Sequence, residues 1–424
     1  MNIKTEEIPS DIKVNSVVEI TTNKVNYFTH GFFKYPCKFI PQVPKWAILK
    51  YTKKGDIILD PFAGSGTTLV EAVINGRKGL AVDFDKLSQL LCKSKTIILT
   101  SKQIDKLIEL KSSLFNKPSV GYDFQPDLHN TLHWFPEENV HELKVLKFNI
   151  ERIFEDIKDE RIYNFLLVCF ASIIKKCSFA DSVSPKPYVS RRIKKQPQQV
   201  QKTFYKTFDS YIEQIREYSS KKAEKCVILS DDAREIHAPQ FDGKVDLAIT
   251  SPPYINAFDY VRSLRLENAW LGFYGDTNII DIKRKQVGTD NVLSKIYSSK
   301  ISKTGIDKLD KIITEISEKD KKKAYIVWKF FEDMGKNFSE VHRLLKKDGH
   351  YILVIGSSKI RGIDVPTHEL FVDIAEKKGY KLENLFSYVI RNRYIRIPRS
   401  GQGGFVDRDW VLDFKKINGK NNKN

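Results

Sequence analysis

Short apolar runs separated by polar turns give the first clear pattern along the chain. The runs at residues 57–59 ("IIL") and 79–84 ("GLAVDF") are typical of strands, and Leu69, Ala72 and Val73 between them recur near helical spacing. A strand, a glycine-containing turn, a helix and a second strand form a βαβ unit, which predicts two parallel strands joined by a right-handed crossover.

The same rhythm returns after residue 225. The stretches "KCVILSDDARE" and "KVDLAITSPPY" each predict a short strand that ends in a polar turn, and a helix is expected at residues 258–273. Further on, the pattern predicts a helix that Gly349 ends, a strand "HYILVIGS", a helix "PTHELFVDIAEKKG" and the strands "YKLENLFSYVI" and "RDWVLDFKK". The predicted fold class is therefore α/β, with helices on both faces of an open sheet.

Residues 101–225 interrupt this alternation, because apolar residues there recur every three or four positions, as in "RIYNFLLVCFASIIKKC". We predict a mainly helical insertion here. The segmentation is a polar lead-in at 1–30, a first part of the sheet domain at 31–100, the insertion at 101–225, a second part of the sheet domain at 226–273, a second, partly flexible insertion at 274–323, the remainder of the sheet domain at 324–415 and a disordered tail at 416–424.

Charge narrows the class of partner. Lysine and arginine number 71 against 53 acidic residues, which gives a formal net charge of +18 and a pI near 9.4. An excess of this size suits a polyanion such as nucleic acid. The five cysteines are scattered with no metal-ligand spacing, so we expect reduced thiols and no metal. No apolar run is long enough to span a bilayer and the first residues are too polar for a signal peptide, so a cytoplasmic protein without membrane contact is expected.

Two turns carry the candidate chemistry. "DPFAGSGTT" at residues 60–68 lacks the Gly-Lys-Ser/Thr of a phosphate-binding loop and the third glycine of a dinucleotide turn. Its glycines still let a ligand approach the backbone, and Asp83, at the end of the next strand, could accept both hydroxyl groups of a ribose.

The second turn, "SPPY" at residues 251–254, follows another strand. Consecutive prolines fix the backbone and have no N–H, so they hold the Ser251 side chain rigidly and leave nearby carbonyls free as acceptors. A hydroxyl and a carbonyl can bind the two hydrogens of an amino group, and Tyr254 offers a flat face for a ring. Because parallel strands end at the same edge of a sheet, both turns should line one crevice.

"DPFAGSGTTLVEA", "TSPPY" and the upstream "FKYPCKFIP" together resemble the S-adenosylmethionine-dependent DNA methyltransferases that modify exocyclic amino groups, giving N4-methylcytosine or N6-methyladenine. The resemblance implies a Rossmann-like methyltransferase sheet, base flipping, and a place in restriction-modification with a cognate restriction nuclease as partner. It also implies that residues 31–100 are the cofactor-binding part, that residues 226–273 are the catalytic part and that the insertion at 101–225 is the DNA-recognition region. It also implies site residues. The cofactor contacts would be Phe39, Asp60, Phe62, Ala63, Gly64, Gly66, Thr67, Asp83 and Asp232, with Asp231 open as an alternative to Asp232. The catalytic residues would be Ser251, Pro252, Pro253 and Tyr254, and serine in the first position favours cytosine N4.

Several alternatives stay open from the sequence. Adenine N6 is the alternative target, and an RNA base methyltransferase or a non-catalytic DNA-binding module are further interpretations. A 5-methylcytosine methyltransferase is a further alternative, because that family carries its nucleophile in a Pro-Cys dipeptide. It is disfavoured here because Pro36-Cys37 precedes the glycine turn, whereas the nucleophile loop of that family follows it. DNA contacts are predicted where basic residues gather without acidic neighbours, at Arg191, Arg192, Lys194, Lys195, Arg391 and Arg393.

Overall fold

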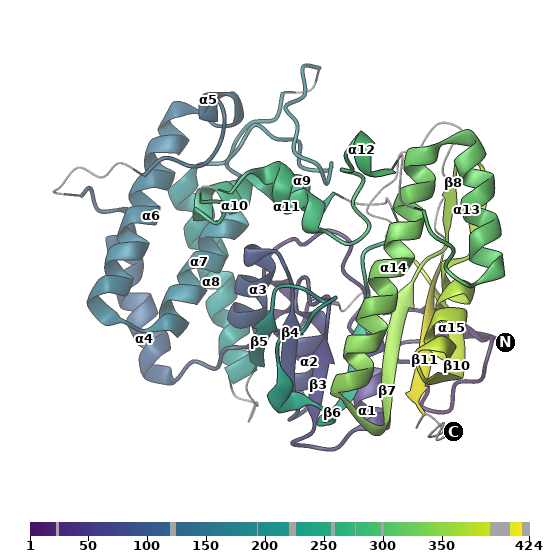
Figure 1. Ribbon diagram of the computed structural model, residues 1–424. Coiled ribbons are helices and arrows are strands. Elements are labelled where there is room, and N and C mark those ends of the chain that lie inside the picture. The colour runs from purple at the N-terminus through teal and green to yellow at the C-terminus, as the bar shows by residue number, and fades with distance from the viewer. Residues whose placement is uncertain are drawn as a thin grey trace.

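Nine strands of the described chain form a single sheet in the computed structural model (Figure 1). The structure describes residues 1–22, 25–118, 124–192, 194–219, 226–255, 259–275, 277–297, 301–390 and 408–417. In spatial order the strands are β1 (Asn2–Thr5), β2 (Val17–Ile20), β10 (Tyr380–Val389), β11 (Arg408–Lys416), β7 (Leu345–Ile355), β6 (Val245–Thr250), β3 (Ile57–Asp60), β4 (Lys78–Val82) and β5 (Cys226–Ser230).

The sheet is mostly parallel. Only β11 runs against its neighbours β10 and β7, while the pairs β1–β2, β2–β10, β7–β6, β6–β3, β3–β4 and β4–β5 are parallel. The chain adds β4 and β5 on one side of β3 and places β6 and β7 on the other side. This reversal of strand order creates a crevice beyond the carboxyl ends of β3 and β6, which is where open α/β sheets bind ligands.

Helices cover both faces of the sheet, so the predicted fold class is confirmed. One face packs on α1 (Gln42–Tyr51) and α2 (Thr67–Ile74), through a core that includes Trp46, Ile58 and Ile249. The other face packs on α14 (Lys321–Leu344) and α15 (Thr367–Lys377), and α13 (Asp307–Lys319) packs in turn against α14. A small hairpin, β8 (Ser358–Ile360) and β9 (Ile363–Val365), lies outside the main sheet.

The predicted helical insertion is a separate layer beside β5 and α3 (Lys86–Thr96) (Figure 1). Its interior is lined by the apolar stripes that the sequence shows, and it continues into the core that contains α3 and α10 (Arg265–Leu271). The helices of this layer are α4 (Ser101–Leu110), α5 (Thr131–Trp134), α6 (Glu137–Ile157), α7 (Glu160–Ile174) and α8 (Val200–Ser219), with the short 3-10 helix η2 (Lys111–Phe115).

The polar segment at residues 1–30 does more than lead into the domain. It supplies β1 and β2, which extend the parallel sheet beyond β10, and a 3-10 helix η1 (Phe28–Gly31). Strand β2 was not recognised in the sequence because it has only four residues. Its alternating pattern is nevertheless real, since Val18 and Ile20 are buried. A strand this short gives too few alternations to be distinguished from a loop.

Two predicted helices and one predicted insertion differ from the structure. The helix expected to stop at Gly349 ends at Leu344, and β7 begins at the next residue with an irregular register at its start. The helix expected at 258–273 is broken at Leu264 into α9 (Tyr260–Ser263) and α10. The weakly patterned insertion at 274–323 contains α11 (Ile279–Lys285), α12 (Ser294–Tyr297) and α13, and the apolar side of α13 is buried against α14.

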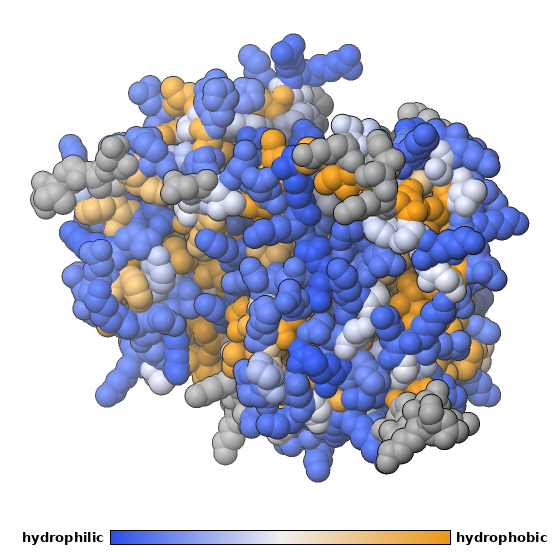
Figure 2. All heavy atoms as spheres, viewed as in Figure 1, coloured by the Kyte–Doolittle hydropathy of each residue, from blue (hydrophilic) through white to orange (hydrophobic). Residues whose placement is uncertain are grey.

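Hydrophilic residues cover most of the face seen in Figure 2, as the chain's 29% of charged residues leads one to expect. In the part of the chain that the structure describes, no helix combines the length and the apolar character needed to cross a membrane. The predicted disordered tail at 416–424 falls almost wholly outside the described residues, apart from Lys416 and Ile417.

Candidate active site

The two turns singled out in the sequence meet at the reversal of strand order. Strands β3 and β6 are hydrogen-bonded neighbours, with Ile58 opposite Leu247 and Leu59 opposite Ala248. At their carboxyl ends the Thr250 hydroxyl donates a hydrogen bond to Oδ1 of Asp60 at 2.6 Å. Residues 190 positions apart in the sequence are therefore in direct contact, as the single crevice predicted from strand ends requires.

The glycine turn is shaped by its own backbone and by two carboxylates. The amide of Phe62 donates to Oδ1 of Asp60 at 3.1 Å, and the amide of Gly64 donates to Oδ2 of Asp83 at 2.7 Å. Gly64 and Gly66 have φ angles of +49° and +76°, which residues with a side chain adopt only with strain. The turn needs glycine at these positions for backbone reasons as well as for access.

Burial makes the carboxylates at this edge unusual. Asp60 is fully buried, which raises its pKa to about 6, and its Oδ2 has no hydrogen-bond partner among the described residues. Burial, with repulsion from Asp85 as a smaller cause, raises the pKa of Asp83 to about 7. Buried carboxylates without a cation favour a positively charged or hydrogen-donating ligand beside them.

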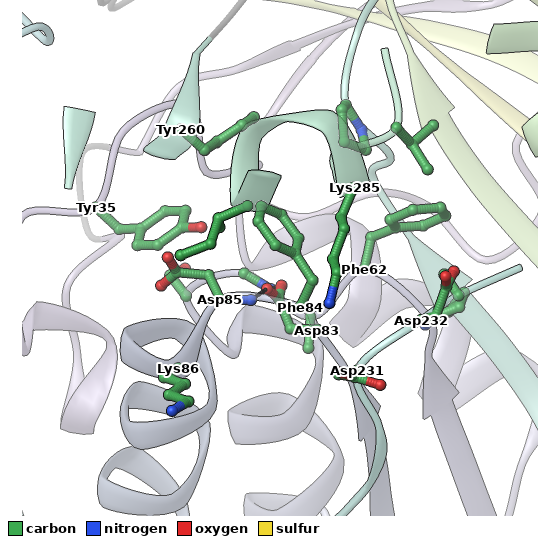
Figure 3. A pocket seen from close by; sticks show the side chains of 18 of the residues that line it. Tyr35, Phe62, Asp83, Phe84, Asp85, Lys86, Asp231, Asp232, Tyr260 and Lys285 are labelled. Atoms are coloured by element: carbon green, nitrogen blue, oxygen red, sulfur yellow. Dashed lines mark hydrogen bonds between the residues drawn. The ribbon is translucent and has the colours of Figure 1, made fainter. Parts of the chain in front are cut away.

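A cavity of about 570 Å³ opens beside the glycine turn (Figure 3). Of the residues predicted from the sequence, those in its wall are Phe39, Phe62, Ala63, Gly64, Thr67, Asp83, Asp232, Ser251 and Pro253. Asp60, Gly66, Pro252 and Tyr254 are not among the lining residues, but each is next in sequence to a residue that lines the cavity. The glycine turn and the first residue of the Ser-Pro-Pro-Tyr corner thus face one space.

The opposite wall is built from residues outside the two turns that the sequence singled out. Tyr260 of α9, Asn268 of α10 and Lys285 of α11 come from the helices after the corner and close the cavity from above the sheet edge. Figure 3 shows the Lys285 side chain reaching into the space between Phe62 and Phe84. No local motif marks these positions, because they reach the site only through the fold of α9–α11.

Asp85 is an acidic residue of the wall that the sequence analysis missed. It caps α3 by accepting the Ser88 amide at 3.0 Å, and its Oδ2 accepts a hydrogen bond from the Asn268 side chain at 3.0 Å. Tyr35 lies over the same place, with its hydroxyl 3.0 Å from the hydroxyl of Ser88. The fragment "FKYPCKF" contains Tyr35 but gave only Phe39 as a predicted contact, whereas Asp85 could have been found from its place two residues after Asp83.

The Asp232 carboxylate is paired with Arg234. The Arg234 guanidinium donates from Nε to Oδ1 at 2.9 Å and from Nη2 to Oδ2 at 2.8 Å, and it also pairs with Asp333. Hydrogen bonds and charge from Arg234 outweigh the effect of burial and lower the pKa of Asp232. Asp231 also lines the cavity, so both acidic residues stay candidates for contacting a ligand.

Tyr254 is tied to a distant strand. Its hydroxyl donates to Oδ1 of Asp409 on β11, and the Tyr388 hydroxyl donates to Oδ2 of the same carboxylate at 2.9 Å. Burial raises the pKa of Asp409. The Ser-Pro-Pro-Tyr corner is thereby fixed from the far end of the chain, while the use of the Tyr254 ring as a stacking surface stays a prediction.

The predicted DNA contacts divide into three groups. Arg191, Arg192 and Lys194 are exposed on the segment that joins α7 to α8. The ammonium of Lys195 instead points inward and donates to the carbonyls of Lys175 and Ala180 at 2.5 and 3.0 Å. Arg391 and Arg393 lie outside the described residues.

Comparison with known proteins agrees with the resemblance found in the sequence. Residues 9–133 match the family model described as "DNA methylase", N6_N4_Mtase. The type II methyltransferase M.MvaI of Kocuria varians is 25% identical over 412 residues, covering 91% of this chain and 87% of that protein. M.AvaI of Anabaena variabilis is 24% identical over 389 residues, covering 84% and 80% of the two chains.

Solved structures match more weakly. A DNA modification methylase homologue from Thermus thermophilus, complexed with S-adenosyl-L-methionine, is 17% identical, covers 46% of this chain and 56% of its own, and has a TM-score of 0.22. At this TM-score the likeness adds nothing to the description of the site. The sequence matches confirm the resemblance to N6/N4 DNA methylases, and they leave open whether the target is cytosine N4 or adenine N6.

Proposed function

We propose that this homologue of the N6/N4 DNA methylases transfers the methyl group of S-adenosylmethionine to the N4 amino group of a cytosine in double-stranded DNA. The observation that carries the proposal is that Ser251 and Pro253 share one cavity with Ala63, Gly64 and Asp83. A corner able to hold an amino group and a turn able to hold a ribose-bearing cofactor thus meet in a single space.

The residues present fit this cofactor. Oδ2 of Asp60 is a buried acceptor without a partner among the described residues, suited to the amino group of the methionine part, and Asp83 is placed to accept ribose hydroxyl groups. Asp231 or Asp232 would contact the adenine. The open φ > 0 turn at Gly64 leaves the backbone accessible. When bound, the cofactor supplies an electrophilic methyl group on a sulfonium.

The chain's own groups would prepare the acceptor base. The amino nitrogen of cytosine is a poor nucleophile because its lone pair is delocalised into the ring. Hydrogen bonds from its two N–H groups to the Ser251 hydroxyl and the Pro252 carbonyl would favour a pyramidal nitrogen and orient its lone pair into the cavity. Rigid prolines hold both acceptors in place before the base arrives.

A paired base cannot present its amino group to such a pocket, so the target nucleotide would be flipped out of the duplex. Serine at the first position of the corner supports cytosine over adenine through the family resemblance. Exposed Arg191, Arg192 and Lys194 are proposed to contact DNA phosphates, and Arg391 and Arg393 are further candidates. A cognate restriction nuclease as partner is proposed on the resemblance alone.

The test is methyl transfer to unmethylated genomic DNA with labelled S-adenosylmethionine, followed by nucleoside digestion and mass spectrometry. N4-methyldeoxycytidine is expected. N6-methyldeoxyadenosine would keep the chemistry and overturn the base, and transfer only to RNA would overturn the substrate. Loss of activity with retained DNA affinity is expected for Ser251→Ala. A wild-type protein that binds DNA and transfers nothing would show a binding module instead of an enzyme.

A further inference from the structure

The segment between α7 and α8 is an ordered projection, which we call the tongue (residues 180–192). It rises at the top of the view in Figure 1, beyond α9 and α11. Ala180 pairs with Val189 in an antiparallel bridge, and the Asp181 amide donates to the Tyr188 carbonyl at 2.9 Å. The Asp181 carboxylate accepts the amides of Val183 and Ser184 at 2.9 and 2.6 Å. These contacts fix a compact hairpin-like loop.

Two lysines hold the base of the tongue from inside. The Lys175 ammonium donates to the Ser184 carbonyl at 2.6 Å, and the Lys195 ammonium donates to the carbonyls of Lys175 and Ala180. Burial lowers the pKa of both groups, that of Lys195 to about 8. Their charge is used to satisfy backbone acceptors, so the sequence prediction that Lys195 contacts DNA does not fit its position.

The tongue presents apolar side chains to solvent although its backbone is ordered. Val183 is 74% exposed and Tyr188 is 46% exposed. Beside them Arg191 and Arg192 are exposed and, among the described residues, make no ion pair. An isolated exposed apolar side chain needs no explanation, but two of them on a pre-formed projection next to unpaired cations indicate a surface that a polyanion covers.

The base of the tongue adjoins the active site. Helix α7, which leads into the tongue, packs against α10, with the ring of Phe170 6.4 Å from that of Trp270. The same helix α10 carries Asn268, which lines the cavity. A duplex that delivers a base to the cavity would therefore pass against the tongue.

We propose that the tongue is the sequence-reading element of this methyltransferase, with Val183 and Tyr188 set against base edges in a groove and Arg191 and Arg192 set on the flanking phosphates. The proposal rests on the proposed function, because it needs DNA as substrate. Apolar side chains discriminate bases through the thymine methyl group and by insertion at base steps, whereas phosphate contacts fix register without reading sequence. Pre-formation of the loop lowers the entropy cost of this contact.

The experiment begins with the wild-type recognition sequence, found by sequencing methylated positions in treated genomic DNA. The value of kcat/KM is then measured on the recognition duplex and on duplexes with single base-pair changes. For Val183→Ser and Tyr188→Ser we expect discrimination at one or two base pairs to fall about 10-fold, with discrimination elsewhere unchanged. Val14→Ser, another exposed valine that is 55% accessible but far from the tongue in the fold, is the matched control and should leave every ratio unchanged.

The arginines should behave differently. Arg191→Ala and Arg192→Ala are expected to weaken binding to all duplexes alike. For each phosphate that is no longer neutralised, the slope of log affinity against log salt should become shallower by about 0.9. Arg152→Ala, an exposed arginine of α6, is the control and should leave the slope unchanged.

Two outcomes overturn the proposal, and they are distinguishable. If the wild type methylates a defined sequence and Val183→Ser with Tyr188→Ser leaves discrimination intact, or lowers it equally at every base pair, the tongue does not read sequence and the proposed function stands. If the wild type transfers no methyl group to DNA, the proposed function fails and the tongue proposal fails with it.

Discussion

The buried carboxylate of Asp60 is expected to lower the stability of the fold and is proposed to bind the amino group of the cofactor. The side chain is fully buried; Oδ1 accepts from Thr250 and Phe62, and Oδ2 has no partner among the described residues. In Asp60→Asn the amide oxygen can keep the two hydrogen bonds of Oδ1. The substitution therefore removes the charge and leaves the local geometry in place.

The magnitude follows from the pKa. Burial raises the pKa of Asp60 from its usual 3.8 to about 6, so the folded protein holds this proton more tightly than the unfolded chain does. The linked stabilisation is fully present below pH 3.8 and is lost as the pH rises through 6. The two-unit shift corresponds to about 3 kcal/mol in total, of which about 1.4 kcal/mol is lost between pH 5 and pH 8.

The free energy of unfolding of Asp60→Asn, relative to wild type, should therefore rise by about 1.4 kcal/mol between pH 5 and pH 8. Urea unfolding of both proteins at several pH values measures this difference, and any constant cost of the buried amide group drops out of it. Asp105→Asn, an exposed change of equal charge on α4, is the control and should show no such trend.

Binding gives the second readout. Titration calorimetry with S-adenosylhomocysteine, which keeps the amino group, should show affinity for Asp60→Asn at pH 8 lower by about 10-fold or more, the usual loss of a hydrogen bond to a charged group. A stability difference that stays constant between pH 5 and pH 8 would refute the argument from burial. Unchanged affinity would refute the proposed contact with the amino group and leave the stability argument intact.

Two further predictions concern the glycine turn and the hydrogen bond that holds the Ser-Pro-Pro-Tyr corner. Gly66→Ala should lower stability in urea unfolding by about 1–2 kcal/mol for the left-handed backbone, and by more than Gly243→Ala, because the new Cβ would lie 3.3 Å from the Cys92 Cα while Gly243 has open space around it. Equal losses would mean that the contact with Cys92 relaxes freely. Asp409→Asn should lower kcat about 10-fold with little change in the KM for S-adenosylmethionine, because a single amide oxygen cannot hold Tyr254 as the carboxylate does. A change in KM alone would contradict a positioning role.

The sequence by itself determined the parts of the site that depend on local chemistry. The glycine turn after β3 and the Ser-Pro-Pro-Tyr corner after β6 are set by residues within a few positions, since backbone freedom at Gly64 and rigidity at Pro252 need no distant partner. Placing both turns in one crevice followed from the rule that parallel strands end at one edge, and the contact between Thr250 and Asp60 bears this out.

Tertiary structure alone decided the rest of the site. Asn268 and Lys285 reach the cavity because α9–α11 fold back over the sheet edge, and Asp409 reaches Tyr254 because β11 is inserted between β10 and β7. The inward position of Lys195 depends on two carbonyls that the chain brings together only when the tongue closes. The spacing of apolar residues predicts which face of an element is buried. It does not predict the partner against which that face packs, because pairing between distant segments is fixed by the packing of the whole core.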